Sequence, residues 1–148
     1  MKVAIDTNIL AYAEGLNGAV QQPATLRVID KLTPENTVIP VQVLGELFNI
    51  LVRKARWQAE KARTTVEIWR GASRGVDTTA ELMRAAVNLA CQHRLPIWDA
   101  IVLSAAADAK CTALLSEDFQ NGFVWQGVTV CNPFAVKPHP LIAALVTP

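Results

Sequence analysis

The stretch KVAIDTN, residues 2–8, places a carboxylate at the end of a short apolar run. Because the apolar run is unbroken rather than alternating, it predicts a strand over Val3–Asp6 that is buried on both faces. Asp6 then has two interpretations. It caps the turn that follows, or it is one ligand of a metal site whose other ligands lie far along the chain.

Similar apolar runs recur along the sequence, separated by segments with helical periodicity. Further strands are expected at residues 37–40, 75–77, 113–115 and 127–131, helices at 24–32, 42–55, 59–69, 79–93 and 100–109, and a loop at 15–23. Strands that alternate with helices predict an α/β fold, a single domain over residues 1–148 with a central parallel sheet flanked by helices on both faces. The tail, residues 133–148, is expected at the periphery.

Length and composition agree with one folded domain. The chain has 148 residues, of which 51% are hydrophobic, and its charged fraction of 18% argues against disorder. The net charge of +1 provides no overall attraction to nucleic acid, so any such attraction must come from a local patch.

The sequence shows no membrane or export signal. Asp6 interrupts the first apolar run before a signal peptide could form, and no apolar stretch reaches the roughly 18 residues of a membrane span. The cysteines, Cys91, Cys111 and Cys131, are odd in number and widely spaced, which favours reduced thiols and a cytoplasmic location. Cys91 and His93 lack a second ligand pair for zinc and are expected to be buried or half-buried core residues.

Four acidic residues lie where a parallel sheet would place a ligand or where a charge is costly. Asp6 and Asp118 each follow an apolar strand, and the carboxyl ends of strands are where α/β sheets bind ligands. Glu46 and Asp99 interrupt apolar helices, where an ionised carboxylate must be paired or bound to a cation. Convergence of the four would favour Mg²⁺ or Mn²⁺, and the absence of His among them disfavours zinc and iron.

Each acid also has a purely structural interpretation. Asp99 is a suitable helix N-cap, Asp118 can form an Asx turn, and Glu46 can extend to the solvent from the helix edge. Strand alternation predicts that Glu117 points away from a site that contains Asp118. By the same alternation Thr7 should point away from Asp6.

Four motifs resemble those of the PIN domain family, and within it the VapC toxins of bacterial toxin–antitoxin pairs. They are VAIDTNIL (residues 3–10), GELFNIL (45–51), WDAIVLSAA (98–106) and LLSEDFQNG (114–122). The resemblance implies a ribonuclease dependent on Mg²⁺ or Mn²⁺, with Asp6, Glu46, Asp99 and Asp118 as its catalytic acids and Asn8 and Ser116 as supporting residues. It also implies a homodimer and a small antitoxin that blocks the site.

The expected mechanism is hydrolysis of an RNA phosphodiester. Asp6, Asp99 and Asp118 would bind one or two ions, and Glu46 would hold a second ion or orient the attacking water. One departure from the family is visible, because residues 41–45 lack the Ser or Thr that often precedes this Glu. That segment therefore offers no side-chain hydroxyl to the site.

A basic stretch at residues 53–74 offers a surface for RNA, for an antitoxin or for a dimer partner. The candidate contacts are Arg53, Lys54, Arg56 and Arg63, and two tryptophans lie in the same stretch. The alternative is a solvated helical face with pairs such as Arg63 and Glu67 at i,i+4. For the tryptophans, ordinary core packing is the default expectation.

Two other functions remain open. A haloacid-dehalogenase-like phosphatase also begins with a strand and an Asp, but it requires a second acid two residues later, where this chain has Asn8. A PIN-like module that binds RNA or a protein partner without catalysis is the more serious alternative. It is disfavoured because all four acids are present.

Overall fold

A six-stranded sheet forms the centre of the computed structural model, which describes residues 1–17 and 20–147. The strand order is β3-β2-β1-β4-β6-β5, and all neighbouring pairs are parallel except β5 with β6. The strands are β1 (Val3–Ile5), β2 (Thr37–Pro40), β3 (Arg74–Val76), β4 (Ala113–Leu115), β5 (Val124–Trp125) and β6 (Val128–Cys131). The expected α/β fold with a parallel sheet is confirmed.

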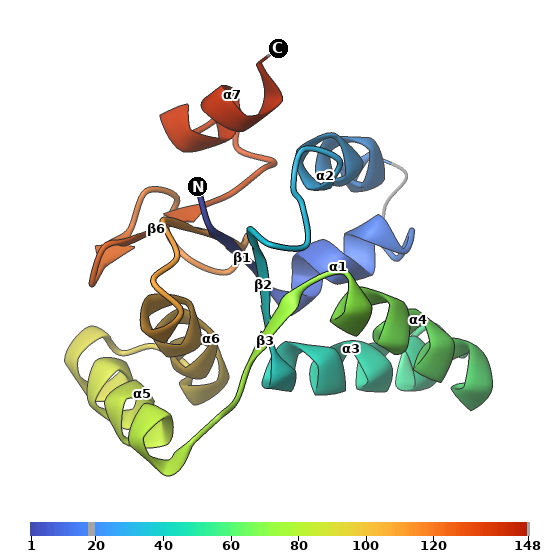
Figure 1. Ribbon diagram of the computed structural model, residues 1–148, viewed down its shortest axis with the longest axis horizontal. Coiled ribbons are helices and arrows are strands. Elements are labelled where there is room, and N and C mark those ends of the chain that lie inside the picture. The colour runs from blue at the N-terminus through green and yellow to red at the C-terminus, as the bar shows by residue number, and fades with distance from the viewer. Residues whose placement is uncertain (18–19, 148) are drawn as a thin grey trace.

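Helices cover both faces of this sheet (Figure 1). They are α1 (Thr7–Ala13), α2 (Gln21–Ile29), α3 (Val41–Arg53), α4 (Ala59–Gly71), α5 (Ala80–His93), α6 (Ile97–Asp108) and α7 (Pro140–Val146). In Figure 1, α1, α3 and α4 lie on one side of the strands, and α5 and α6 lie on the other. The terminal helix α7 packs against α2 and buries Ile142.

The strand order reverses between β1 and β4. The chain passes from β1 to β2 to β3 in one direction and then returns through α5 and α6 to β4, on the other side of β1. Right-handed crossovers in opposite directions place their helices on opposite faces of the sheet. This reversal point, at the carboxyl ends of β1 and β4, is where such folds usually bind their ligands.

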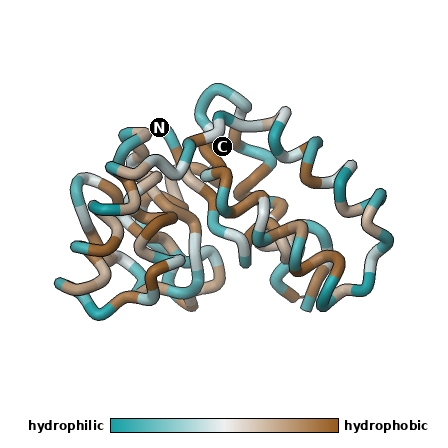
Figure 2. Tube along the Cα trace, turned by 90° about the horizontal axis from the view of Figure 1, so that it is seen from below, coloured by the Kyte–Doolittle hydropathy of each residue, from teal (hydrophilic) through white to brown (hydrophobic). Residues whose placement is uncertain are grey.

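Several elements show no alternation of polar and apolar residues, because they are buried on all sides in the core. All residues of β1 and β4 are buried, and so is every residue of α6 from Ala100 to Ala106. The outer helices are buried on one side only, and Figure 2 shows the alternation of hydrophobic and hydrophilic residues along them. These buried elements form a rigid frame for the residues at the carboxyl ends of β1 and β4.

Some expectations about local structure were wrong. Helix α1 was not predicted, because seven residues that are mostly buried show no 3.6-residue pattern. The predicted loop at 15–23 is shorter, since α2 begins at Gln21, and residues 18–19 of that loop lie outside the described residues. The two-residue strand β5 was also missed, being too short to leave a pattern.

Two further corrections concern α5 and α6. Cys91 and His93 are exposed rather than buried: Cys91 lies on the outer side of α5, and His93 is the last residue of that helix, where its ring packs edge-on against Phe123. Helix α6 begins at Ile97 with Pro96 as its N-cap, so Asp99 lies inside the first turn and does not cap the helix. Proline is tolerated at a helix start, where its missing N–H would have no partner.

Candidate functional site

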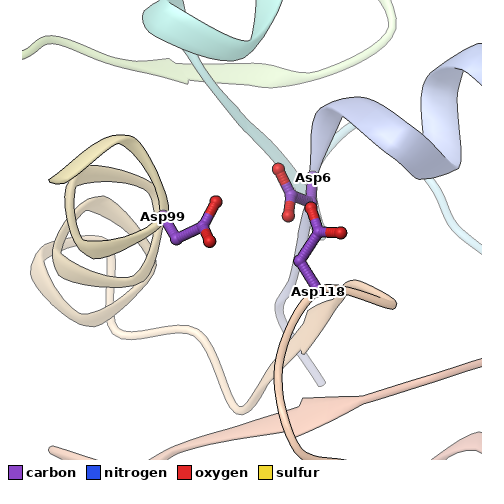
Figure 3. Close-up of side chains that lie close together, drawn as sticks. All are labelled: Asp6, Asp99 and Asp118. Atoms are coloured by element: carbon purple, nitrogen blue, oxygen red, sulfur yellow. The ribbon is translucent and has the colours of Figure 1, made fainter. Parts of the chain in front are cut away.

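Three of the four predicted acids meet at the carboxyl ends of β1 and β4. Asp6 follows β1, Asp118 follows β4, and Asp99 comes from the first turn of α6 (Figure 3). One carboxylate oxygen from each lies within 4.8 Å of the other two. The backbone N–H of Asp6 donates to the Leu115 carbonyl at 3.0 Å, which fixes the two strand ends relative to each other.

Asp6 is the most enclosed of the three, with 3% of its surface exposed. One carboxylate oxygen accepts a bond from the Thr7 N–H at 2.7 Å, so Asp6 also caps α1, and the other accepts from the Ser116 hydroxyl at 2.7 Å. Burial nevertheless dominates and raises its pKa from 3.8 to about 7, with smaller contributions from Asp118 and Asp99. The two interpretations of Asp6, cap and ligand, are therefore compatible.

Asp99 carries the second perturbed carboxyl group. Its pKa is raised from 3.8 to about 6, chiefly by desolvation and with smaller contributions from the charges of Asp118 and Glu46. Two neighbouring carboxylates with raised pKa values indicate that the site holds more negative charge than its surroundings can stabilise. Such clusters are typical of functional sites.

Glu46 stands beside this group and is held by two side chains. Its Oε2 accepts from the Thr7 hydroxyl at 2.6 Å, and its Oε1 accepts from the Gln42 amide at 2.8 Å. The expectation that Thr7 points away was wrong, because Thr7 begins a helix and strand alternation does not apply there. Residues 41–45 offer no hydroxyl to Glu46, and the hydroxyl that contacts it comes from Thr7 of α1.

Asn8 and Ser116 both contact the aspartates. The Asn8 amide donates to Asp118 Oδ2 at 2.8 Å, whereas its Oδ1 is buried and has no partner in the part of the chain that the structure describes. The Ser116 hydroxyl donates to Asp6 and accepts from the Asp118 N–H at 3.1 Å. These contacts orient both carboxylates at the strand ends.

Glu117 is not among the converging acids, although alternation is not the reason, because β4 ends at Leu115 and residues 117–118 lie beyond the strand. Its carboxylate accepts from the Tyr12 hydroxyl at 2.5 Å, and this bond is the main reason that the pKa of Tyr12 rises to about 12. Tyr12 also packs edge-on against Phe134. Tyr12, Thr7 and Gln42 were missed by sequence reasoning, since only knowledge of α1 and of the α3 face would have identified them.

The donor set fits a hard divalent cation. Every converging side chain offers oxygen, and a cation would offset the mutual repulsion of the aspartates. The unpartnered Asn8 Oδ1 is an additional acceptor beside Asp118 and suits a water bound to such an ion. The residues therefore fit Mg²⁺ or Mn²⁺ better than zinc.

An open groove of about 800 Å³ adjoins the acids and shares Glu46 with them. Trp98 and Lys54 also line it. Of the basic candidates, Arg63 pairs with Glu60 at 2.6 Å rather than with Glu67, which pairs instead with Arg70. Residues three apart and residues four apart are both neighbours on a helix surface, so either spacing allows an ion pair.

The tryptophans of the basic stretch contribute mainly to packing. Trp57 and Trp69 are half-buried against the core, and the Trp69 indole donates to Glu14 at 2.8 Å. Lys61 lies over the Trp57 ring at 3.8 Å from its centroid.

Among residues 1–17 and 20–147, no helix is long and apolar enough to cross a bilayer.

The sequence matches the model of one protein family, the PIN domain, over residues 3–120. A search of curated proteins gave no match. The solved structures with the same fold include VapC20 from Mycobacterium tuberculosis, described as a Sarcin-Ricin loop cleaving toxin. It is 20% identical, with a TM-score of 0.66, over 76% of this chain and 87% of the other.

Two further solved structures extend the likeness. A toxin-antitoxin complex from Klebsiella pneumoniae is 18% identical, with a TM-score of 0.69, over 91% of this chain and 100% of the other. VapBC2 from Rickettsia felis, bound to a DNA fragment from its promoter, is 16% identical, with a TM-score of 0.63, over 88% and 97%. At these identities the likeness establishes the fold, and chemistry must be argued from the site.

Proposed function

Because this chain belongs to the PIN domain family, whose model matches residues 3–120, we propose that it is a metal-dependent endoribonuclease that hydrolyses RNA phosphodiester bonds. The observation that carries the proposal is the meeting of Asp6, Asp99 and Asp118 at the reversal point of the sheet. Two raised carboxyl pKa values and one unpartnered amide oxygen point to a cation there.

Asp6, Asp99 and Asp118 would hold Mg²⁺ or Mn²⁺. When bound, the ion supplies a more acidic water and stabilises the charge that develops on the phosphate. Asp6 is the most rigid of the three ligands because the end of β1, the α1 cap and the Ser116 hydroxyl all fix it. Asn8 keeps Asp118 turned toward the site.

Glu46 would orient the attacking water and accept its proton. Each of its carboxylate oxygens already accepts one hydrogen bond, from Thr7 and from Gln42, and each has room for another. The two bonds hold the carboxylate in one orientation at the edge of the aspartate cluster. Thr7 and Gln42 are therefore positioning residues for Glu46.

We further propose that the protein is the toxin of a toxin–antitoxin pair, acting in the cytoplasm as a homodimer and inhibited by a small antitoxin. Support comes from the solved structures of the same fold that are toxins or toxin–antitoxin complexes. Expression of the chain alone should arrest growth, and Asp6→Ala should relieve the arrest. Arrest that persists with Asp6→Ala would contradict a toxic activity at this site.

The ribonuclease proposal is tested with a mixed RNA pool. Cleavage should require Mn²⁺ or Mg²⁺, stop with EDTA and be lost in Asp99→Asn. A matched control is Asp108→Asn, since Asp108 lies on the same helix but is exposed at its far end. Cleavage that survives both EDTA and Asp99→Asn would refute the metal mechanism.

Two alternatives have distinct outcomes in the same assay. RNA binding without cleavage, with every metal tried, would indicate a PIN-like binding module. Hydrolysis of small phosphomonoesters without RNA cleavage would indicate a phosphatase, although the position two residues after Asp6 is Asn8 rather than an acid.

A further inference from the structure

Asp118 differs from the other two aspartates of the cluster because no strand or helix holds it. β4 ends at Leu115, and residues 116–118 form neither a helix nor a strand. Asp6, by contrast, caps α1 directly after a buried strand, and Asp99 lies in the first turn of α6. The position of the Asp118 carboxylate therefore depends on the side-chain contacts of this short segment.

Helix α1 supplies two of those contacts from one face. The Asn8 amide donates to Asp118 Oδ2 at 2.8 Å, and the Tyr12 hydroxyl donates to Glu117 Oε1 at 2.5 Å. Residues four apart share a face of a helix, so Asn8 and Tyr12 point toward the segment together. Two successive residues of the segment are thus tied to two successive turns of α1.

The ring of Tyr12 is a fixed point for this attachment. It is half-buried and packs edge-on against Phe134, with 5.2 Å between the ring centroids. A hydrogen bond from a phenol to a carboxylate is charge-assisted and is about twice as strong as a bond between neutral groups. The bond therefore ties Glu117, and with it the backbone beside Asp118, to a ring that packing already holds.

The same bond keeps the charge of Glu117 apart from the aspartates. Glu117 is the neighbour of Asp118 in sequence, but it is not one of the three acids that converge. Like charges repel at short range, so a Glu117 carboxylate that moved freely would displace Asp118 from the cluster or compete with it for a cation. A donor on the side of α1 prevents both.

We propose that Tyr12 is a positioning residue for the metal site, and that it acts through Glu117 to hold Asp118 in place as a ligand. This inference rests on the proposed metal-dependent function. It assigns part of the metal affinity to two side chains that do not bind the ion. When the bond is removed, residues 116–118 gain freedom and the Asp118 carboxylate is less often in position.

Mn²⁺ binding to the metal-free protein, measured by calorimetry, tests this apart from catalysis. Tyr12→Phe keeps the ring against Phe134 and removes the hydroxyl. It should weaken Mn²⁺ binding about 10-fold, the lower end of the effect of removing groups that orient metal ligands. Glu117→Ala should weaken it equally, and the two substitutions together should cost little more than either alone, because they break the same bond.

Two further variants identify the cause of the loss. Glu117→Gln should keep the Mn²⁺ affinity to within about threefold, since its amide oxygen still accepts from the Tyr12 hydroxyl. Glu14→Ala is the matched control, because Glu14 also accepts a bond from an aromatic side chain, Trp69, at the end of α1. It should leave the affinity unchanged. Urea denaturation of each variant with EDTA separates lost stability from lost affinity.

The dependence of RNA cleavage on Mn²⁺ concentration gives a second readout. Tyr12→Phe should raise the Mn²⁺ concentration for half-maximal cleavage about 10-fold, while kcat at saturating Mn²⁺ returns toward that of the parent. A low kcat that no Mn²⁺ concentration restores overturns the inference, because a residue that only positions a ligand is compensated by more metal.

The remaining outcomes distinguish this inference from the proposed function. Mn²⁺ affinity of Tyr12→Phe within about twofold of the parent overturns the positioning role, whatever happens to stability. Equal losses for Glu117→Gln and Glu117→Ala overturn it as well, since the charge of Glu117 would then bind the ion. A loss for Glu14→Ala as large as that for Tyr12→Phe also overturns it. Failure of the unsubstituted protein to bind Mn²⁺ or Mg²⁺ overturns the proposed metal site itself, whereas Mn²⁺ binding without RNA cleavage overturns the ribonuclease proposal and leaves the positioning role standing.

Discussion

Replacing Asp6 by Asn should stabilise the metal-free protein while removing its proposed metal site. Burial raises the pKa of Asp6 from 3.8 to about 7. At pH values between these two, the carboxyl group of Asp6 is protonated in the folded state and ionised in the unfolded state. Stability from this group is therefore complete below pH 3.8 and is lost as the pH rises toward about 7. At pH 8 the folded protein carries the full cost of a buried charge.

The size of the effect follows from the pKa difference. Each pKa unit corresponds to about 1.4 kcal/mol, so the change from 3.8 to about 7 amounts to about 4 kcal/mol at pH 8. Rearrangement of the neighbouring acidic side chains reduces this cost of burying the charge. We therefore expect Asp6→Asn to raise the free energy of unfolding by about 2 kcal/mol. For a chain of this length that is a gain of about 4–8 °C in Tm.

The assay is urea denaturation with EDTA at pH 8 and at pH 4. At pH 4 Asp6 is protonated in the folded protein, so most of the gain should vanish there. Asp108→Asn is the matched control and should change stability by no more than about 0.5 kcal/mol at either pH. A gain that is absent at pH 8, or equally large at pH 4, would refute the reasoning that burial of charge destabilises this site.

Three other predictions concern metal binding, the residue that holds Glu46 and the basic stretch. Mn²⁺ should raise Tm at pH 8. Its binding should release more protons at pH 6 than at pH 8, because the carboxyl groups of the site are partly protonated at the lower pH. Calorimetry in two buffers of different ionisation enthalpy measures the number of protons released. Thr7→Val should lower kcat about 10-fold or more with little change in KM, since Glu46 loses one of its two bonds; an unchanged kcat argues against positioning. Lys54→Gln should reduce the salt dependence of RNA binding, with the slope falling by about one, whereas Arg63→Gln should have less effect because Glu60 already pairs with Arg63.

The acidic residues were predictable because their positions have a simple physical meaning. Asp6 and Asp118 follow buried strands, and parallel strands bring their ends to one edge of the sheet. Asp99 was predictable as an acid in an apolar helix, although its helix begins three residues earlier than expected. None of these inferences needed a contact that only the folded chain reveals.

The second layer of the site was not predictable in the same way. Thr7 reaches Glu46 only because α1 starts directly after Asp6, and a short buried helix leaves no periodic pattern in the sequence. Gln42 reaches Glu46 because residues four apart share a helix face, but many such pairs exist and few have a function. The exposure of Trp98 was likewise not predictable, because it depends on how the packing of α6 buries Ala100–Ala106 and leaves the first turn open.

The strand order has a consequence for synthesis of the chain. Ser116 and Asp6 are separated by 110 residues, and β1 receives its second neighbour only when β4 has been made. A nascent or truncated chain that ends before β4 therefore has an open strand edge at β1 and no assembled acid cluster. The acid cluster can therefore assemble only after β4 and Asp118 have been made, and chains truncated before β4 should aggregate.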